Sequence, residues 1–367
     1  MHKNIFSRRA FLKGLGATGG AILLSPLRSF PVLAEKPPCP EVAGRKIRWI
    51  VPNSVGGGYD TYSRMIEPFY ERALGADIFV ENRPGAGGIL GAKIISEAKP
   101  DGLTIGILNG SGLMAVALAG DKNVPNPEKD FTILGRIARS RHVWVTGRKS
   151  PFRTIEDVLR EAEKRPIVFG TGDVGNVNFI SAIFTSDFLG IDPAVIAGYS
   201  GSRKGVLAAL RGDVDLVSYN FESILNQIEN GDVRPLMQIS YEPISSHPSL
   251  AGVPLLGSQK GMAARHASDS GRDVNEAVTD TRALSKLIGA GRLIVAPPGL
   301  DKTLSICMER VLNETLTAED FKAAAAKAHR SLDIADGKTS REDLRVVTQA
   351  MSKFVPLIQE AIKKIRR

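Results

Sequence analysis

Short apolar runs alternate along the chain with longer segments in which apolar residues recur every three or four positions. The short runs predict β-strands, which we place at 47–51, 78–80, 103–108, 131–137, 143–146, 167–169, 194–197, 216–219, 233–240 and 293–296. The longer segments predict helices, and those with the clearest boundaries are 154–164, 176–189 and 204–210. Strands and helices in alternation are typical of an α/β fold with mainly parallel sheets.

We expect two lobes, each with a mainly parallel sheet, and a hinged central cleft between them. We expect 42–140 plus roughly 241–367 to form the first lobe and 141–240 to form the second. Residues 257–291 have a polar centre with little apolar periodicity, so we interpret them as a polar surface insertion. From residue 341 onward, apolar residues three and four positions apart predict a helical tail that packs across the body, with a kink at Pro356.

The N-terminus has the pattern of an export signal. Arg8 and Arg9 precede an uncharged, mostly apolar stretch at 14–27. This stretch is shorter than the about 20 residues that a membrane-spanning helix needs, but it suits a signal peptide. Small residues near Ala34 indicate cleavage there. We therefore predict that 1–34 is a twin-arginine signal peptide and that the mature protein is periplasmic.

Charge and cysteine content exclude several classes of protein. The signal segment holds five basic residues and no acidic ones, so without it the formal net charge falls from +9 to +4. No cluster of Lys and Arg with interleaved aromatic residues indicates a nucleic-acid partner. Two cysteines cannot build a metal site by themselves. Pairing in an oxidising compartment is open to them, but Cys39 lies in a proline-rich segment that we expect to be loose, so we predict no disulfide with Cys307 that the fold requires.

A glycine-rich loop at 54–58 follows the first predicted strand and precedes a helix. Its glycines let the backbone approach a ligand closely. The free amides at the helix start, together with the positive end of the helix dipole, favour a carboxylate or phosphate. Asp60 either contacts the ligand or only caps the helix and pairs with Arg64, four residues on. The candidate ligand-binding residues here are Ser54, Val55, Gly56, Gly57, Tyr59 and Asp60.

A second loop, 170–175, matches the G-x-G-x-x-G pattern of dinucleotide-binding proteins. Asp192 has roughly the right spacing to bind a ribose, but it precedes Pro193 rather than ending a strand. An exported protein also has little access to nucleotides. We therefore interpret 170–175 as a second amide-lined loop, in the other lobe. Its candidate contacts are Thr171, Gly172, Asp173, Asn176 and Asn178.

Two further Gly/Ser loops, 109–112 and 198–202, also follow predicted strands. Ligands of open α/β sheets bind at the carboxyl ends of strands, although plain surface turns remain an alternative for these two loops. Loops of this kind in both halves are typical of binding proteins whose lobes close on an anion. The candidate contacts are Asn109, Ser111, Tyr199, Ser200 and Gly201.

The sequence gives little support for catalysis. The histidines after the signal segment are His142, His247, His266 and His329, and they are scattered without the spacing of metal ligands. Neither a G-x-S-x-G nor an H-E-x-x-H pattern occurs. We predict that the protein is not an enzyme and has no catalytic residue, bound metal or cofactor.

Several segments, in order, resemble the solute receptors of tripartite tricarboxylate transporters, which are Bug-type periplasmic binding proteins. The resemblance is carried by Val51-Pro52, Gly56-Gly57-Gly58, Asp60 and Arg64, then by Val80-Glu81-Asn82-Arg83-Pro84-Gly85-Ala86-Gly87-Gly88, Lys99-Pro100-Asp101-Gly102, Gly198-Tyr199-Ser200-Gly201, Gly212-Asp213-Val214-Asp215 and Val295-Ala296-Pro297-Pro298-Gly299. It covers most of the chain after the signal segment.

This resemblance implies two α/β lobes and a small carboxylate held mainly by main-chain groups and bridging waters. By position, contacts would come from 54–60, 170–178 and near 199–200. The chain departs from the pattern at Asn178, where many relatives have histidine, and at the longer segment 257–291.

The resulting prediction is a monomeric receptor that binds a small organic acid and delivers it to the membrane permease subunits of a tripartite importer. A receptor that serves a membrane sensor kinase is an alternative. A periplasmic nucleotide-dependent oxidoreductase built on 170–175 is a weaker one.

Overall fold

The computed structural model describes residues 37–365 except residue 246. The predicted signal peptide, 1–34, lies outside the described residues. Within them, the first sheet has the strand order β11-β4-β10-β3-β1-β2 and the second has β7-β6-β8-β5-β9. We call the first sheet with its helices the first lobe, and the second sheet with its helices the second lobe.

The first sheet is mixed. β1 pairs in parallel with β2 and β3, whereas β10 runs antiparallel to both β3 and β4, and β11 is antiparallel to β4. The strands are β1 (Lys46–Val51), β2 (Asp77–Asn82), β3 (Thr104–Asn109), β4 (Thr132–Ala138), β10 (Arg292–Ala296) and β11 (Ala335–Asp336).

The second sheet is mixed in the same way. β6 is parallel to β7 and β8, and β5 is antiparallel to β8 and β9. Its strands are β5 (His142–Gly147), β6 (Ile167–Gly170), β7 (Pro193–Ile196), β8 (Leu216–Asn220) and β9 (Val233–Ile239). The predicted two-lobed α/β fold is confirmed, but the sheets are less parallel than expected. The strands that run against the others are β10 and β11 in the first sheet and β5 in the second.

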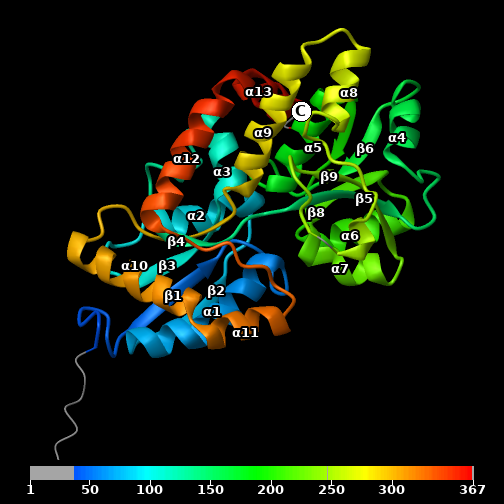
Figure 1. The fold of residues 1–367 in the computed structure, drawn as a ribbon. Coiled ribbons are helices and arrows are strands. Elements are labelled where there is room, and N and C mark those ends of the chain that lie inside the picture. Colours follow the sequence, from blue (N-terminus) through cyan, green and yellow to red (C-terminus); the bar gives the residue numbers. More distant parts are fainter. Residues whose placement is uncertain (1–36, 246, 366–367) are drawn as a thin grey trace, which may run out of the picture. The chain divides into compact units, whose positions relative to one another are not determined.

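Helices cover both sheets (Figure 1). Those that begin before β9 are α1 (Gly58–Leu74), α2 (Ile89–Ser96), α3 (Gly110–Leu118), α4 (Ile155–Ala162), α5 (Val177–Phe188), α6 (Ser202–Arg211) and α7 (Phe221–Glu229). The later ones are α8 (Met262–Asp269), α9 (Val274–Gly289), α10 (Lys302–Thr317), α11 (Glu319–Lys327), α12 (Gly337–Met351) and α13 (Val355–Ile365). Short 3-10 turns lie at Ala86–Gly88, Pro248–Leu250 and Ser352–Phe354.

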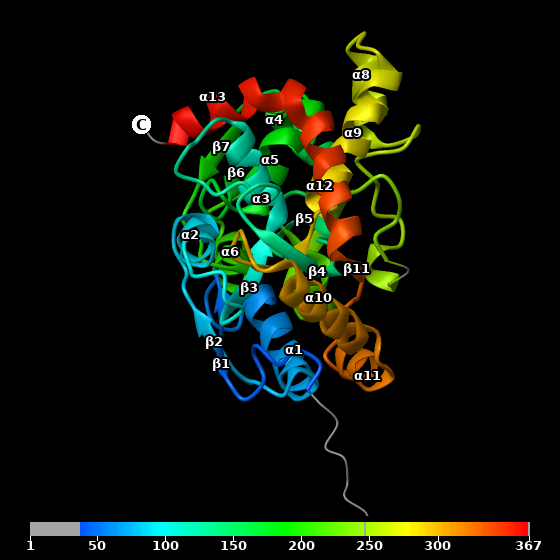
Figure 2. The ribbon, with the colours of Figure 1, turned by 90° about the vertical axis from the view of Figure 1, so that its left-hand side faces the viewer.

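The C-terminal helices pack along the body, as the apolar spacing predicts (Figure 2). Leu344, Val347, Met351 and Ile358 are buried, in one core cluster with residues from both lobes. The break between α12 and α13 falls at a 3-10 turn, and Pro356 is the second residue of α13. Proline is tolerated there because a first-turn amide has no intrahelical acceptor to lose.

Residues 257–291, interpreted above as a polar insertion, contain α8 and α9. One face of α9 is buried through Val278, Leu284 and Leu287, while its polar residues lie mostly on the other faces. Asp273 begins the helix, because its carboxylate accepts hydrogen bonds from the amides of residues 275 and 276. α9 contacts α3, α5 and α12, so this segment adds to the shared core as well as to the surface.

The two cysteines, whose pairing the sequence left open, are joined. Cys39 and Cys307 form a disulfide, with their Cα atoms 5.8 Å apart. The segment around Cys39 is not loose, since the Cys39 carbonyl accepts hydrogen bonds from the amides of Val42 and Ala43 and Cys39 itself is fully buried. The disulfide therefore ties the start of the described chain to α10.

Removing this disulfide should lower stability, because it closes a loop of 268 residues in the unfolded chain. We expect Cys39→Ser with Cys307→Ser to lose about 2–4 kcal/mol of unfolding free energy, measured by urea denaturation of the oxidised proteins. The control is the same measurement in reductant, where the two proteins should differ much less. Equal stabilities under oxidising conditions would contradict a structural role for the disulfide.

Candidate functional site

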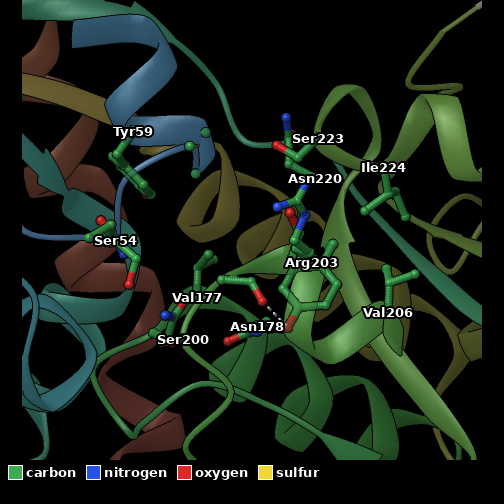
Figure 3. A pocket seen from close by; sticks show the side chains of 18 of the residues that line it. Ser54, Tyr59, Val177, Asn178, Ser200, Arg203, Val206, Asn220, Ser223 and Ile224 are labelled. Carbon is green, nitrogen blue, oxygen red and sulfur yellow. Dashed lines mark hydrogen bonds between the residues drawn. The ribbon is translucent and has the colours of Figure 1, made fainter. Parts of the chain in front are cut away.

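Loops from both lobes enclose a cavity of about 330 Å³ (Figure 3). The first lobe contributes the loop after β1, part of the connection from β4 to β5, and the first residue of β10. The second lobe contributes the N-terminal ends of α5, α6 and α7. The lining residues are Asn53, Ser54, Val55, Gly56, Gly57, Gly58, Tyr59, Ser140, His142, Asn176, Val177, Asn178, Ser200, Gly201, Ser202, Arg203, Val206, Tyr219, Asn220, Ser223, Ile224, Gln227 and Arg292.

Among the described helices, α1, α5, α6 and α7 begin at this cavity, and none of the four has a side-chain N-cap. The residues before them are Gly57, Asn176, Gly201 and Asn220, and no side chain of these accepts a hydrogen bond from the helix start. In contrast, α4, α9 and α10 are capped by Thr154, Asp273 and Asp301. Uncapped helix starts leave amide donors and the positive end of the helix dipole facing the cavity.

Asp60 shapes the loop before α1 and does not line the cavity. Its carboxylate, 3% exposed, accepts hydrogen bonds from the Gly56 amide at 2.8 Å, Arg64 Nε at 2.9 Å and Asn82 Nδ2 at 3.0 Å. Gly56 has φ 78°, a conformation that favours glycine. Of the two roles considered for Asp60, the structure shows the pairing with Arg64.

The structure brings nine of the predicted site residues together at the cavity. They are Ser54, Val55, Gly56, Gly57, Tyr59, Asn176, Asn178, Ser200 and Gly201. Asn109 and Ser111 lie at the start of α3 instead, where the Asn109 side chain accepts from the Gly112 amide and the Ser111 hydroxyl donates to the Ile288 carbonyl. The Thr171 hydroxyl donates to the Gly172 carbonyl and does not line this cavity.

The loop 170–175 makes hydrogen bonds within the protein that leave little room for a dinucleotide. The Gly172 amide donates to Asn178 Oδ1 at 3.2 Å. Across the lobes, the Gly87 amide donates to Asp173 Oδ2 at 3.0 Å, and Asn109 Nδ2 donates to the carbonyl of residue 175 at 3.2 Å. The space beside Gly172, Asp173 and Tyr199 is only about 50 Å³. The loop thus contributes hydrogen bonds that join the two lobes.

Sequence reasoning missed Arg292, the first residue of β10. Its side chain is buried and its guanidinium lies over the rings of Tyr59 and Tyr62, at 5.2 Å and 4.6 Å from their centroids. Nη1 donates to the Arg139 carbonyl at 3.4 Å. The one local signal was a charged residue at the start of a strongly apolar strand, and nothing near it in sequence shows the tyrosines.

Several buried polar atoms at the cavity have no hydrogen-bond partner of normal geometry in the described part of the chain. They are Asn53 Oδ1, Tyr59 Oη, Asn178 Nδ2 and Arg292 Nε. Buried polar groups are nearly always paired, so an unpaired set around one cavity indicates that a ligand or water completes it. No Asp or Glu lines the cavity, whereas Arg203 and Arg292 do. The cavity is therefore suited to an anion.

Two further groups at the cavity are neutral. Burial, assisted by the charge of Arg292, lowers the pKa of His142 to about 3, and its Nδ1 lies 3.1 Å from the Ser218 hydroxyl. Burial raises the pKa of Tyr59, against the opposing effect of Arg292. Both side chains therefore offer neutral polar atoms at neutral pH, and neither adds charge to the cavity.

No group of three or more His, Cys, Asp or Glu side chains in the described residues is arranged to hold a metal ion. Of the helices in the described residues, none is long and apolar enough to span a membrane.

Comparison with known proteins agrees with the predicted family. A family model described as the tripartite tricarboxylate transporter family receptor matches residues 63–335. Protein BugT of Bordetella pertussis is 23% identical over 81% of this chain and 82% of its own length. A UPF0065 protein from the tcbD-tcbE intergenic region of Pseudomonas sp. strain P51 is 26% identical over 59% of this chain, and the match spans 64% of that relative, less than two thirds of its length.

A solved structure shares the fold. MatC from Rhodopseudomonas palustris with bound malate matches with a TM-score of 0.64 and 19% identity, over 87% of this chain and 99% of that one.

The low pKa of His142 predicts a loss of stability in acid. The unfolded chain binds a proton at this histidine near pH 6.5, whereas the folded chain binds it only near pH 3. The contribution of His142 to the free energy of unfolding is therefore complete above about pH 6.5 and is lost as the pH falls towards 3. Between pH 7 and pH 5 we expect His142→Gln to lose about 2 kcal/mol less unfolding free energy than the wild type, measured by urea denaturation at each pH. The exposed His329→Asn is the control and should follow the wild type. A His142→Gln protein with the wild-type pH dependence would contradict the assignment.

Proposed function

We propose that this chain, which belongs to the family of tripartite tricarboxylate transporter receptors, is a periplasmic receptor that binds a small organic carboxylate and delivers it to the membrane subunits of a tripartite importer. The observation that supports the ligand class is the cavity between the lobes. Uncapped helix starts and two arginines line it, and no acidic side chain among its lining residues opposes them.

The size of the cavity favours a small metabolite. Its volume of about 330 Å³ is at the lower end of the range of about 300–1,000 Å³ for small-molecule sites. Apolar side chains, among them Val177, Val206 and Ile224, form part of its wall and suit a short hydrocarbon body. The malate bound to MatC, a protein of the same fold, is an acid of this kind.

The cellular context of the proposal comes from the family and from the sequence. Tripartite transporter receptors pass their ligand to membrane subunits, and the twin-arginine signal predicted at 1–34 would bring the chain to the periplasm. The hydrogen bonds that join 170–175 to the first lobe suit a closed state, which hinge motion would open to release the acid.

Binding of an organic acid can be measured directly. Unfolding and refolding the protein would remove any ligand that it carries. We expect the refolded protein to bind at least one of a panel of succinate, malate, glutarate, adipate, citrate and benzoate, and to give a saturable heat of binding in calorimetry. The corresponding neutral amide should not bind. If no acid in such a panel binds, the proposed function is contradicted.

A charge placed at the cavity should discriminate an anion site from a neutral one. Ser200 lines the cavity and is exposed to it. We expect Ser200→Asp to bind the preferred acid at least about tenfold more weakly than Ser200→Asn, which has nearly the same shape, and tenfold corresponds to about 1.4 kcal/mol. Equal affinities of the two variants would argue that the ligand is uncharged.

A further inference from the structure

We infer that Arg292 is the residue whose guanidinium binds a carboxylate of the ligand directly and so decides which acids are accepted. This inference rests on the proposed function, because it names the side chain that recognises the acid in the same cavity. It adds a charged anchor to a site whose other donors are mainly backbone amides.

The first support is an unpaired buried charge. In the described part of the chain two arginines are buried, Arg136 and Arg292, each with 2% exposure. Arg136 is neutralised by Asp333 at 3.1 Å and by Asp343. Arg292 has no ion pair in the described residues, and its Nε has no acceptor. A buried cation without an anion is strongly unfavourable, so the missing negative charge is expected from outside the chain.

The second support is the position of the guanidinium at the cavity wall. The guanidinium packs against the Tyr59 and Tyr62 rings, and its Nη1 donates to the Arg139 carbonyl at 3.4 Å. A β-carbon at Gly58, the first residue of α1, would lie 3.4 Å from Nη2. Glycine at this position therefore lets the guanidinium and the N-terminus of α1 approach the same ligand group.

Groups around Arg292 do not supply the missing charge. Tyr59 and Tyr62 are neutral phenols, since burial raises the pKa of both, and His142 is neutral because burial lowers its pKa to about 3. Glu222 is the acidic residue in the first turn of α7. Its carboxylate accepts hydrogen bonds from Asn220 Nδ2 and from the Ser331 hydroxyl, the latter at 2.7 Å. It does not line the cavity.

A carboxylate fits this arrangement chemically. The planar guanidinium presents parallel N–H donors that match the two oxygens of a carboxylate, and such pairs are shorter and stronger than neutral hydrogen bonds. Lysine at the same position would supply a point charge without this fork. The ligand is therefore an acid that places a planar carboxylate against Arg292 and its hydrocarbon body against the apolar wall.

The test compares Arg292→Gln and Arg292→Lys with the wild type and with Arg211→Gln, an exposed arginine outside the cavity. Each protein is titrated calorimetrically with the acid from the panel above that the wild type binds most tightly. We expect at least about a hundredfold weaker binding for Arg292→Gln, at least about tenfold for Arg292→Lys, and less than threefold for Arg211→Gln. If the wild type binds an acid and Arg292→Gln binds it within threefold, the inference is overturned while the proposed function stands. If the wild type binds none of the acids, both fail.

A second measurement separates ligand binding from a purely structural role. Without ligand, Arg292→Met should be as resistant to urea as the wild type or more so, because the substitution removes an unpaired buried charge. Arg136→Met should be less resistant, because it removes the buried one of the two arginines that pair with Asp333 and Asp343 and leaves only the half-exposed Arg139. If Arg292→Met is destabilised like Arg136→Met, or if none of the Arg292 variants folds, Arg292 serves the fold and the inference is overturned.

Discussion

Hydrogen-bond donors that have no acceptor within the protein are the constraint on which the site depends. Helices α1, α5, α6 and α7 begin at one cavity without side-chain caps, and the Arg292 guanidinium lies buried beside the first of them. Either feature alone has ordinary explanations, because some other helices of this chain also lack caps. Together they leave positive potential in a space that no acidic side chain of its lining neutralises.

Hydrogen bonds from neutral donors to carboxylates help to hold the lobes together, and the cavity could bind an acidic ligand by the same kind of hydrogen bond. The Gly87 amide donates to Asp173, and the Ser331 hydroxyl donates to Glu222, so acidic residues of the second lobe accept from donors of the first. None of these four residues lines the cavity, so the two carboxylates are kept out of the space that an anion would occupy. The shared core that includes α3, α5, α9 and α13 joins the lobes at another place. A hinge motion that opens the cleft would therefore break these hydrogen bonds and leave the shared core packed.

Much of the fold and part of the site could be predicted because their signals are local. A glycine loop between a strand and a helix is visible in a few residues, and the loop at 54–58 does line the cavity. Features made by distant segments could not be predicted. The partners of Arg292, Tyr59 and Tyr62, lie far away in sequence, and Cys39 is separated from Cys307 by 268 residues. Asp173 is a further example. The sequence shows that this residue carries a carboxylate, but not that the carboxylate accepts a hydrogen bond from the Gly87 amide of the other lobe.

Acidic residues near the cavity illustrate how a receptor for anions can retain negative charge close to its site. Asp60 lies within one turn of the start of α1, where an exposed carboxylate would compete with a ligand for the helix amides. Three donors of its own lobe occupy it instead: the Gly56 amide, Arg64 Nε and Asn82 Nδ2. Its charge thereby helps to fix the shape of the glycine loop, and Asp60 itself does not line the cavity. The position of Asp60 in the sequence, next to the loop that lines the site, is thus explained by the hydrogen bonds that shape that loop.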